Sequence, residues 1–190
     1  MPAVRALRRR TTISPEEDRS VSANPIAPNV EFARKLIEHC CWEDERVWKL
    51  AIVPLSHEQF TREVGFGLGA IQRECAHIMN TEQICLARIR GEPPPRKSQL
   101  DRRELRDQWR EIHAAWSDFA EALDADLLLS DCMTADGAGA VTLKVWQLIF
   151  NVVYQGTAHR SDIMRMVAEV HEPPAFDLSL MQFLSGVFRQ

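Results

Sequence analysis

Apolar residues recur with helical spacing in four long segments of this chain, and this periodicity restricts the fold more than any other feature. The clearest segment spans residues 101–123, where apolar positions alternate by four and three residues, as in the seam between packed helices. These positions are Leu105, Trp109, Ile112, Trp116, Phe119 and Leu123. Asp101 and Glu104 precede them with the spacing of a capping box, so a helix is expected to begin there.

The other three segments show the same pattern over residues 29–54, 69–90 and 142–170. Pro54 ends the first segment, because proline cannot continue a helix, and Gly91 closes the second. Each segment is long enough to form several helical turns. The sequence therefore predicts four long amphipathic helices.

The residues between these helices predict connections rather than strands. A short terminal helix is expected around residues 178–188, and a loop is expected at Asp136, Gly137 and Gly139. No segment shows sustained two-residue alternation with turn signals. The predicted fold is all-α, a four-helix bundle with a short C-terminal helix.

The length of 190 residues allows one domain with a sizeable core. Residues 1–28 lack helical periodicity and contain several prolines among polar residues, so they are expected to form a flexible leader. The folded domain is predicted to span residues 29–190.

The charge and cysteine content exclude several classes of partner. The formal net charge is -4, and the only basic run, in the leader, has no interleaved aromatic residues, so neither nucleic acid nor a membrane is an expected partner. No apolar run reaches the ~18 residues of a membrane span. The five cysteines form no CxxC pair and fit small buried side chains in a reducing compartment, which predicts a cytoplasmic protein.

Two polar residues, Gln155 and His159, interrupt the apolar pattern of the last helix. At ~100° per residue, both are expected to project toward the core with Val152 and Ile163, one turn apart on the same face. A buried polar group without a partner costs about 1–3 kcal/mol. The pair therefore predicts either a hydrogen-bonded contact or a small binding site.

Asp44 and His77 are the partners that the other helices offer. Asp44 lies between apolar positions of the first helix, and His77 lies on a flank of the second, roughly 100–120° from the centre of its stripe. Taken alone, Asp44 is typical of a helix cap or of an ion pair, for example with Arg160. Together with Gln155 and His159, however, these residues could present two imidazoles and two oxygens to a divalent ion.

Residues from all four helices resemble the DinB-like, or YfiT-like, superfamily of four-helix-bundle metalloenzymes. The similarity covers roughly residues 29–185. It includes the segments WEDERVW at 42–48, ECAHI at 74–78, LARIRG at 86–91 and WQLIFNVVYQGTAHR at 146–160, with Leu105, Trp109, Trp116 and Phe119 in the third helix.

This resemblance implies a site for zinc or nickel. The family site has one histidine on the second helix and two, one turn apart, on the fourth. Carried over by position, the metal ligands are His77, Gln155 and His159, with Gln155 in place of a histidine. Asp44 is expected to orient a ligand or to accept a proton.

The resemblance also implies a metal-dependent enzyme with a small-molecule substrate. Relatives include thiol-dependent S-transferases and a mycothiol-dependent isomerase, so metal-assisted thiol transfer or hydrolysis is expected, with a low-molecular-weight thiol as a candidate partner. The alternative is a metal-free, degenerate member that acts as a small-molecule binding or stress-response interaction module. A homodimer with a structural role is a third interpretation.

Overall fold

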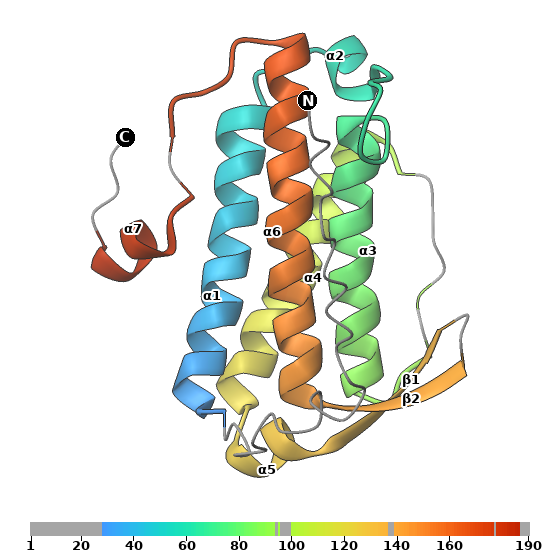
Figure 1. The fold of residues 1–190 in the computed structure, drawn as a ribbon, viewed down its shortest axis with the longest axis vertical. Helices are drawn as coiled ribbons and strands as arrows, with labels where there is room; N and C mark the ends of the chain where they lie inside the picture. Colours follow the sequence, from blue (N-terminus) through green and yellow to red (C-terminus); the bar gives the residue numbers. More distant parts are fainter. Residues whose placement is uncertain (1–27, 94, 96–99, 137–138, 177, 187–190) are drawn as a thin grey trace, which may run out of the picture.

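The computed structural model describes residues 28–93, 95, 100–136, 139–176 and 178–186. Four long helices run side by side (Figure 1): α1 (Val30–Val47), α3 (Ile71–Ile89), α4 (Arg102–Ala122) and α6 (Val145–Val170). This confirms the predicted all-α bundle. All of the predicted leader except Pro28 lies outside the described residues.

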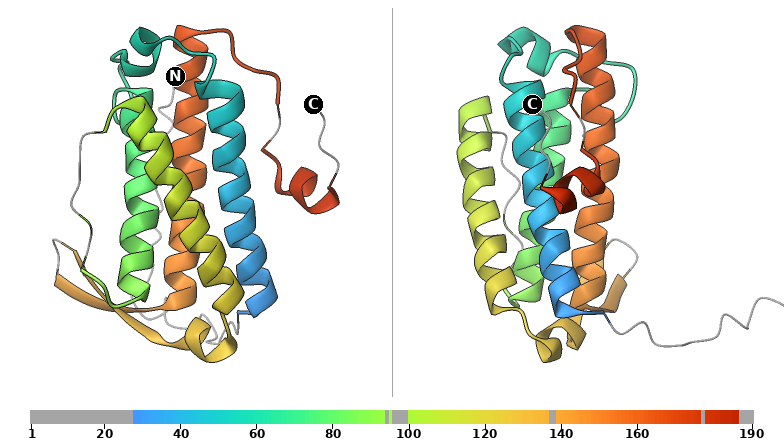
Figure 2. Two further views of the ribbon diagram at one scale, coloured as in Figure 1. Left: turned by 180° about the vertical axis from the view of Figure 1, so that it is seen from behind. Right: turned by 90° about the vertical axis from the view of Figure 1, so that its left-hand side faces the viewer.

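The helices close into a ring around one core. α6 packs against α1 and α3, and α4 packs against the same two helices from the other side, as the views in Figure 2 show. Trp109 of α4 is fully buried. Its ring packs edge to face against that of Trp48, the residue directly after α1, with the ring centroids 5.9 Å apart. The seam predicted for residues 105–123 is therefore the inner face of α4.

The helix boundaries follow local signals in the sequence. The Asp101 side chain accepts hydrogen bonds from the amides of Arg103 and Glu104, and the Glu104 side chain accepts one from the Asp101 amide, which is the predicted capping box. At its C-terminal end, α1 continues into a π-helical turn, η2 (Trp48–Ile52), before Pro54. This turn keeps Trp48, Ala51 and Ile52 buried.

The loop predicted before the last helix was wrong, because a β-hairpin occupies this place. β1 (Asp131–Asp136) and β2 (Gly139–Lys144) pair antiparallel over six residues each, and α6 begins directly after β2. Asp136 ends β1 and Gly139 begins β2, whereas Gly137 lies outside the described residues. The sequence pattern does not reveal the hairpin, because it is a two-stranded ribbon in which apolar residues such as Met133 and Val141 are exposed, so apolar and polar residues do not alternate between a buried and an exposed face.

Three short helices complete the described fold: α2 (His57–Thr61), α5 (Ala125–Leu129) and α7 (Leu180–Ser185). The predicted terminal helix corresponds to α7, which is shorter than expected and lies beside α1 (Figures 1 and 2). Phe183 of α7 packs against His39 and Trp42, with ring centroids 5.1 and 5.5 Å away. None of the helices in the described part of the chain combines the length and the apolar character that a membrane span requires.

Candidate metal centre

The contact between α3 and α6 brings His77 and His159 together. Their ring centroids are 4.3 Å apart and the ring planes are inclined by 59°. Both side chains are half-buried, so they remain within reach of solvent. Two imidazoles at this distance can present nitrogen atoms to one small ligand.

Glu74 fixes the orientation of His159. Its Oε2 lies 2.7 Å from Nδ1 of His159, and its Oε1 accepts a hydrogen bond of 2.6 Å from the amide of Leu68. An ionised carboxylate only accepts hydrogen bonds, so this contact assigns the ring proton to Nδ1. Nε2 of His159 is then left with its lone pair, which is the arrangement found behind metal-binding histidines.

The loop before α3 holds Glu74 in place. Gly67 adopts φ +56°, and a Cβ at this residue would lie 2.5 Å from Oε1 of Glu74 and 2.9 Å from Cε of Met166. The loop is tied back by Arg73, whose Nε donates to the carbonyl of Leu68 at 2.6 Å. Only glycine fits at residue 67 without displacing the buried carboxylate.

Two further polar residues of α6 lie near His159 in sequence. Asp162 offers a carboxylate oxygen to a group in which the ligand atoms of Glu74, His159 and Asp162 all lie within 4.8 Å of one another. Gln155 is half-buried one turn before His159, and its amide makes no hydrogen bond to the residues that the structure describes. Its oxygen is therefore available to a ligand.

Asp44 lies in the core, in contact with a different set of residues. Its Oδ1 accepts a hydrogen bond of 2.7 Å from Nη1 of Arg160, and Nη2 of Arg160 lies 2.5 Å from Oε2 of Glu43. Burial alone would raise the pKa of Asp44, but Arg160 beside it holds the pKa below its usual value. The ion pair with Arg160 agrees with one interpretation of the sequence, whereas a role of Asp44 in catalysis stays a prediction.

The polar residue that enters the core from α6 is Arg160 rather than Gln155 or His159. Arg160 is 1% exposed, whereas Gln155 and His159 are half-buried on the flank toward α3. The centre of the buried face of α6 was therefore predicted from the sequence at His159, about one residue before its actual position. Gly156 offered a signal, because a Cβ there would lie 2.8 Å from Nη1 of Arg160. Glu74 had no comparable signal, since its partners come from other parts of the chain.

A sequence model described as the DinB family matches residues 27–185, a range that includes all four long helices. The chain belongs to the DinB family. A search of curated proteins found no match.

The residues of this DinB family member fit a metal ion. His77 and His159 supply two imidazoles, Gln155 supplies a free amide oxygen on the same face of α6, and Glu74 supports one imidazole from behind. If these three residues held an ion, they would leave coordination positions for water or substrate, as in catalytic rather than structural sites. The identity of the metal does not follow from these donors.

Proposed function

We propose that this DinB family member is a metal-dependent enzyme in which His77, Gln155 and His159 hold a divalent ion, zinc or nickel. The substrate is a small molecule, and the nucleophile is a low-molecular-weight thiol or water. The observation that carries the proposal is the 2.7 Å hydrogen bond between buried Glu74 and Nδ1 of His159, beside the ring of His77. Because the buried carboxylate of Glu74 binds Nδ1 of this half-buried histidine, the other ring nitrogen, Nε2, is left to bind a ligand.

The protein side chains position and polarise the site. Glu74 keeps the proton on Nδ1 of His159, prevents the ring from rotating and makes the imidazole a better donor. When bound, a divalent ion at such an open site lowers the pKa of a water or thiol and so supplies a nucleophile near neutral pH. His77 and His159 are half-buried rather than fully enclosed, so a small thiol can approach them from solvent.

Asp44 acts in this proposal as a positioning residue. It holds Arg160, which follows His159 directly on α6, so the ion pair fixes the rotation of this turn about the helix axis. This turn of α6 is thereby held to α1 through Arg160 and to α3 through His159.

Metal analysis of protein purified without chelator tests the proposal. We expect His159→Ala to lower the zinc or nickel content by about one equivalent per chain, because a three-ligand site loses its best-oriented donor. His171→Ala, at the exposed C-terminal cap of α6, is the matched control and should leave the content unchanged. The proposal is wrong if His159→Ala retains all of the metal. Consumption of a small thiol with an electrophilic acceptor, lost in His159→Ala, would support thiol transfer.

One observation favours the metal-free alternative, in which the protein is a small-molecule binding or stress-response interaction module. Gln155 supplies a neutral amide oxygen, which is a weaker ligand for transition metals than imidazole. In this case His159→Ala should leave the metal content of the protein unchanged, and the Glu74–His159 contact would serve only to join α3 to α6.

A further inference from the structure

A second group of potential metal ligands lies inside the bundle, apart from the histidines on α3 and α6. It consists of Cys40 and Asp44 on α1, Glu82 on α3 and His113 on α4, and all four side chains are buried. We propose that these four residues bind a divalent cation, zinc by their donor types, as a closed structural site that links three helices. This site shares no ligand with the proposed centre at His77, Gln155 and His159.

The distances within the group match ligands arranged around one ion. Sγ of Cys40 lies 3.9 Å from Oδ2 of Asp44 and 3.8 Å from Oε1 of Glu82. Nε2 of His113 lies 3.4 Å from Oδ2 of Asp44 and 3.6 Å from Oε2 of Glu82. In a tetrahedral site with bonds of about 2.0–2.3 Å, neighbouring ligand atoms are separated by about 3.3–3.6 Å. Ligand atoms of Cys40, Asp44 and Glu82 all lie within 4.8 Å of one another, whereas His113 faces the other oxygen of Glu82, so binding one ion through all four residues requires these side chains to move together.

His113 provides an independent indication of a missing ligand. It is only 8% exposed, yet neither of its ring nitrogens makes a hydrogen bond to the residues that the structure describes. Asp44, Glu45 and Glu82 lie 3.4–3.8 Å from its ring nitrogens, which is within ion-pair distance, but none of these contacts has the length and alignment of a hydrogen bond. Leaving a buried polar group unsatisfied costs about 1–3 kcal/mol. A cation between His113 and the two carboxylates would satisfy Nε2.

Both carboxylates are oriented by donors outside the group. Arg160 donates to Oδ1 of Asp44 at 2.7 Å, so Oδ2 is the oxygen that faces Cys40 and His113. The indole Nε1 of Trp109 donates to Oε2 of Glu82 at 2.7 Å, so Oε1 is free to face Cys40. Outer hydrogen bonds of this kind position the ligands of protein metal sites.

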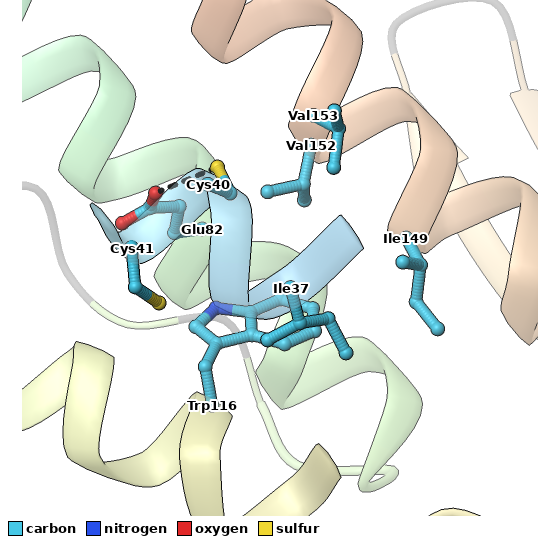
Figure 3. A pocket seen from close by; sticks show the side chains of 8 residues that line it. All are labelled: Ile37, Cys40, Cys41, Glu82, Trp116, Ile149, Val152 and Val153. Carbon is cyan, nitrogen blue, oxygen red and sulfur yellow. Dashed lines mark hydrogen bonds between the residues drawn. The ribbon is translucent and has the colours of Figure 1, made fainter. Parts of the chain in front are cut away.

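Charge and surroundings indicate a divalent ion in a closed site. A Cys40 thiolate and the two carboxylates carry three negative charges. Arg160, which contacts Cys40 and Asp44, also pairs with buried Glu43, so its single positive charge leaves an excess of negative charge that a divalent cation would offset. The combination of sulfur, nitrogen and oxygen donors suits zinc. Figure 3 shows Cys40 and Glu82 beside a cavity of about 10 Å³, whose other lining residues include Ile37, Ile149, Val152 and Val153. Cys40, Asp44 and Glu82 are themselves almost fully buried, as expected for a structural site.

Cobalt spectroscopy tests the proposal, because only the buried group contains sulfur. Protein stripped of metal and loaded with Co²⁺ without oxygen should show a thiolate-to-cobalt charge-transfer band in the near ultraviolet. We expect this band in the wild type and in His159→Ala, and its loss in Cys40→Ser. Cys85→Ser is the matched control: it removes a buried thiol that lies on α3 and outside the proposed group, so the band should remain.

Several results would overturn this assignment. They are a folded wild-type protein that shows no band at saturating cobalt, a band that survives Cys40→Ser, or a band that disappears in Cys85→Ser. If Cys40→Ser does not fold, His113→Gln decides instead: it should bind cobalt more weakly than the wild type, and an unchanged affinity contradicts the site. If His159→Ala keeps all of its cobalt while the band is present, the proposed catalytic centre is wrong and the buried site stands. If the band is absent while His159→Ala loses cobalt, the reverse holds, so the two proposals can fail separately.

Discussion

Glu74 and His159 connect α3 to α6 through a contact in which both oxygens of the carboxylate are used. Oε2 faces Nδ1 of His159 and Oε1 accepts from the amide of Leu68. Glu74 is therefore suited to orient a ligand rather than to be one, although its oxygen lies within 4.8 Å of ligand atoms of His159 and Asp162. The proposed centre depends on this carboxylate as much as on the residues that would touch the ion.

Glu74→Gln should weaken metal binding without removing a ligand. An amide has one oxygen, so it cannot accept from both Leu68 and His159, and its NH2 group would face one of these donors. We expect zinc affinity to fall by about 10–100-fold, measured by competition with a chelator. Glu63→Gln, at an exposed carboxylate paired with Arg73, is the control. Equal affinities for Glu74→Gln and the wild type would show that the contact has no part in metal binding.

Gln155→His should strengthen the same site. An imidazole at this position would replace the amide oxygen with a better nitrogen donor, one turn from His159. We expect zinc affinity to rise by about tenfold or more, which corresponds to about 1.4 kcal/mol. Ser161→His adds an imidazole to an exposed position of α6 and should not change the affinity. A decrease or no change in Gln155→His would place residue 155 outside the coordination shell.

Gly67→Ala should destabilise the protein more than Gly91→Ala does. Both glycines have positive φ, at +56° and +68°, so both substitutions carry a backbone penalty of about 1–2 kcal/mol. A Cβ at residue 91 meets nothing within 4 Å, whereas one at residue 67 would collide with Glu74 and Met166. Urea unfolding should show the larger loss for Gly67→Ala, accompanied by weaker zinc binding. Equal losses would mean that the loop moves aside without disturbing Glu74.

Arg160→Met should cost about 3–5 kcal/mol of unfolding free energy, because it leaves Asp44 and Glu43 buried without their counter-charge. Urea unfolding followed by circular dichroism measures this loss. Arg103→Met, at an arginine of α4 whose side chain is 91% exposed, should change stability by less than about 0.5 kcal/mol. A loss for Arg160→Met as small as that of the control would contradict a structural role for the ion pair.

His39 should make the protein less stable in weak acid. Burial, followed by the nearby Arg160, lowers the pKa of His39 below 6.5, so the folded state binds fewer protons than the unfolded chain. Its contribution to stability is present above pH 6.5 and is lost as the pH falls through its lowered pKa. His39→Gln should reduce the slope of unfolding free energy against pH in this range, by at most about 1.4 kcal/mol per pH unit.

The matched control for this prediction is His57→Gln, since His57 is an exposed histidine on α2. It should leave the slope unchanged. A slope for His39→Gln equal to that of the wild type would show that other groups cause the acid sensitivity.

The four long helices could be predicted because amphipathic periodicity and capping are local properties of the sequence. The capping box at Asp101 and Glu104 placed the start of α4 correctly for the same reason. The hairpin could not be found in this way, because its six-residue strands are stabilised mainly by pairing with each other. The π-helical turn at residues 48–52 also left no signal, since it preserves the apolar face of α1.

The region of the candidate site could be found from the sequence, but the contacts that orient its residues could not. His77 and His159 meet as the resemblance implied, but Glu74 is recognisable only once α3 and α6 are packed. The choice between His159 and Arg160 for the core depends on Asp44 and Glu43, more than a hundred positions earlier in the chain. Helical periodicity alone cannot decide between adjacent residues when both are polar.

His159 and Arg160 are consecutive residues that face different neighbours, Glu74 on α3 and Asp44 on α1. Inserting or deleting a single residue earlier in α6 would turn both side chains by about 100° and separate them from these partners together. The stretch between the hairpin and His159 is therefore expected to accept substitutions at its exposed positions far more readily than any change in its length.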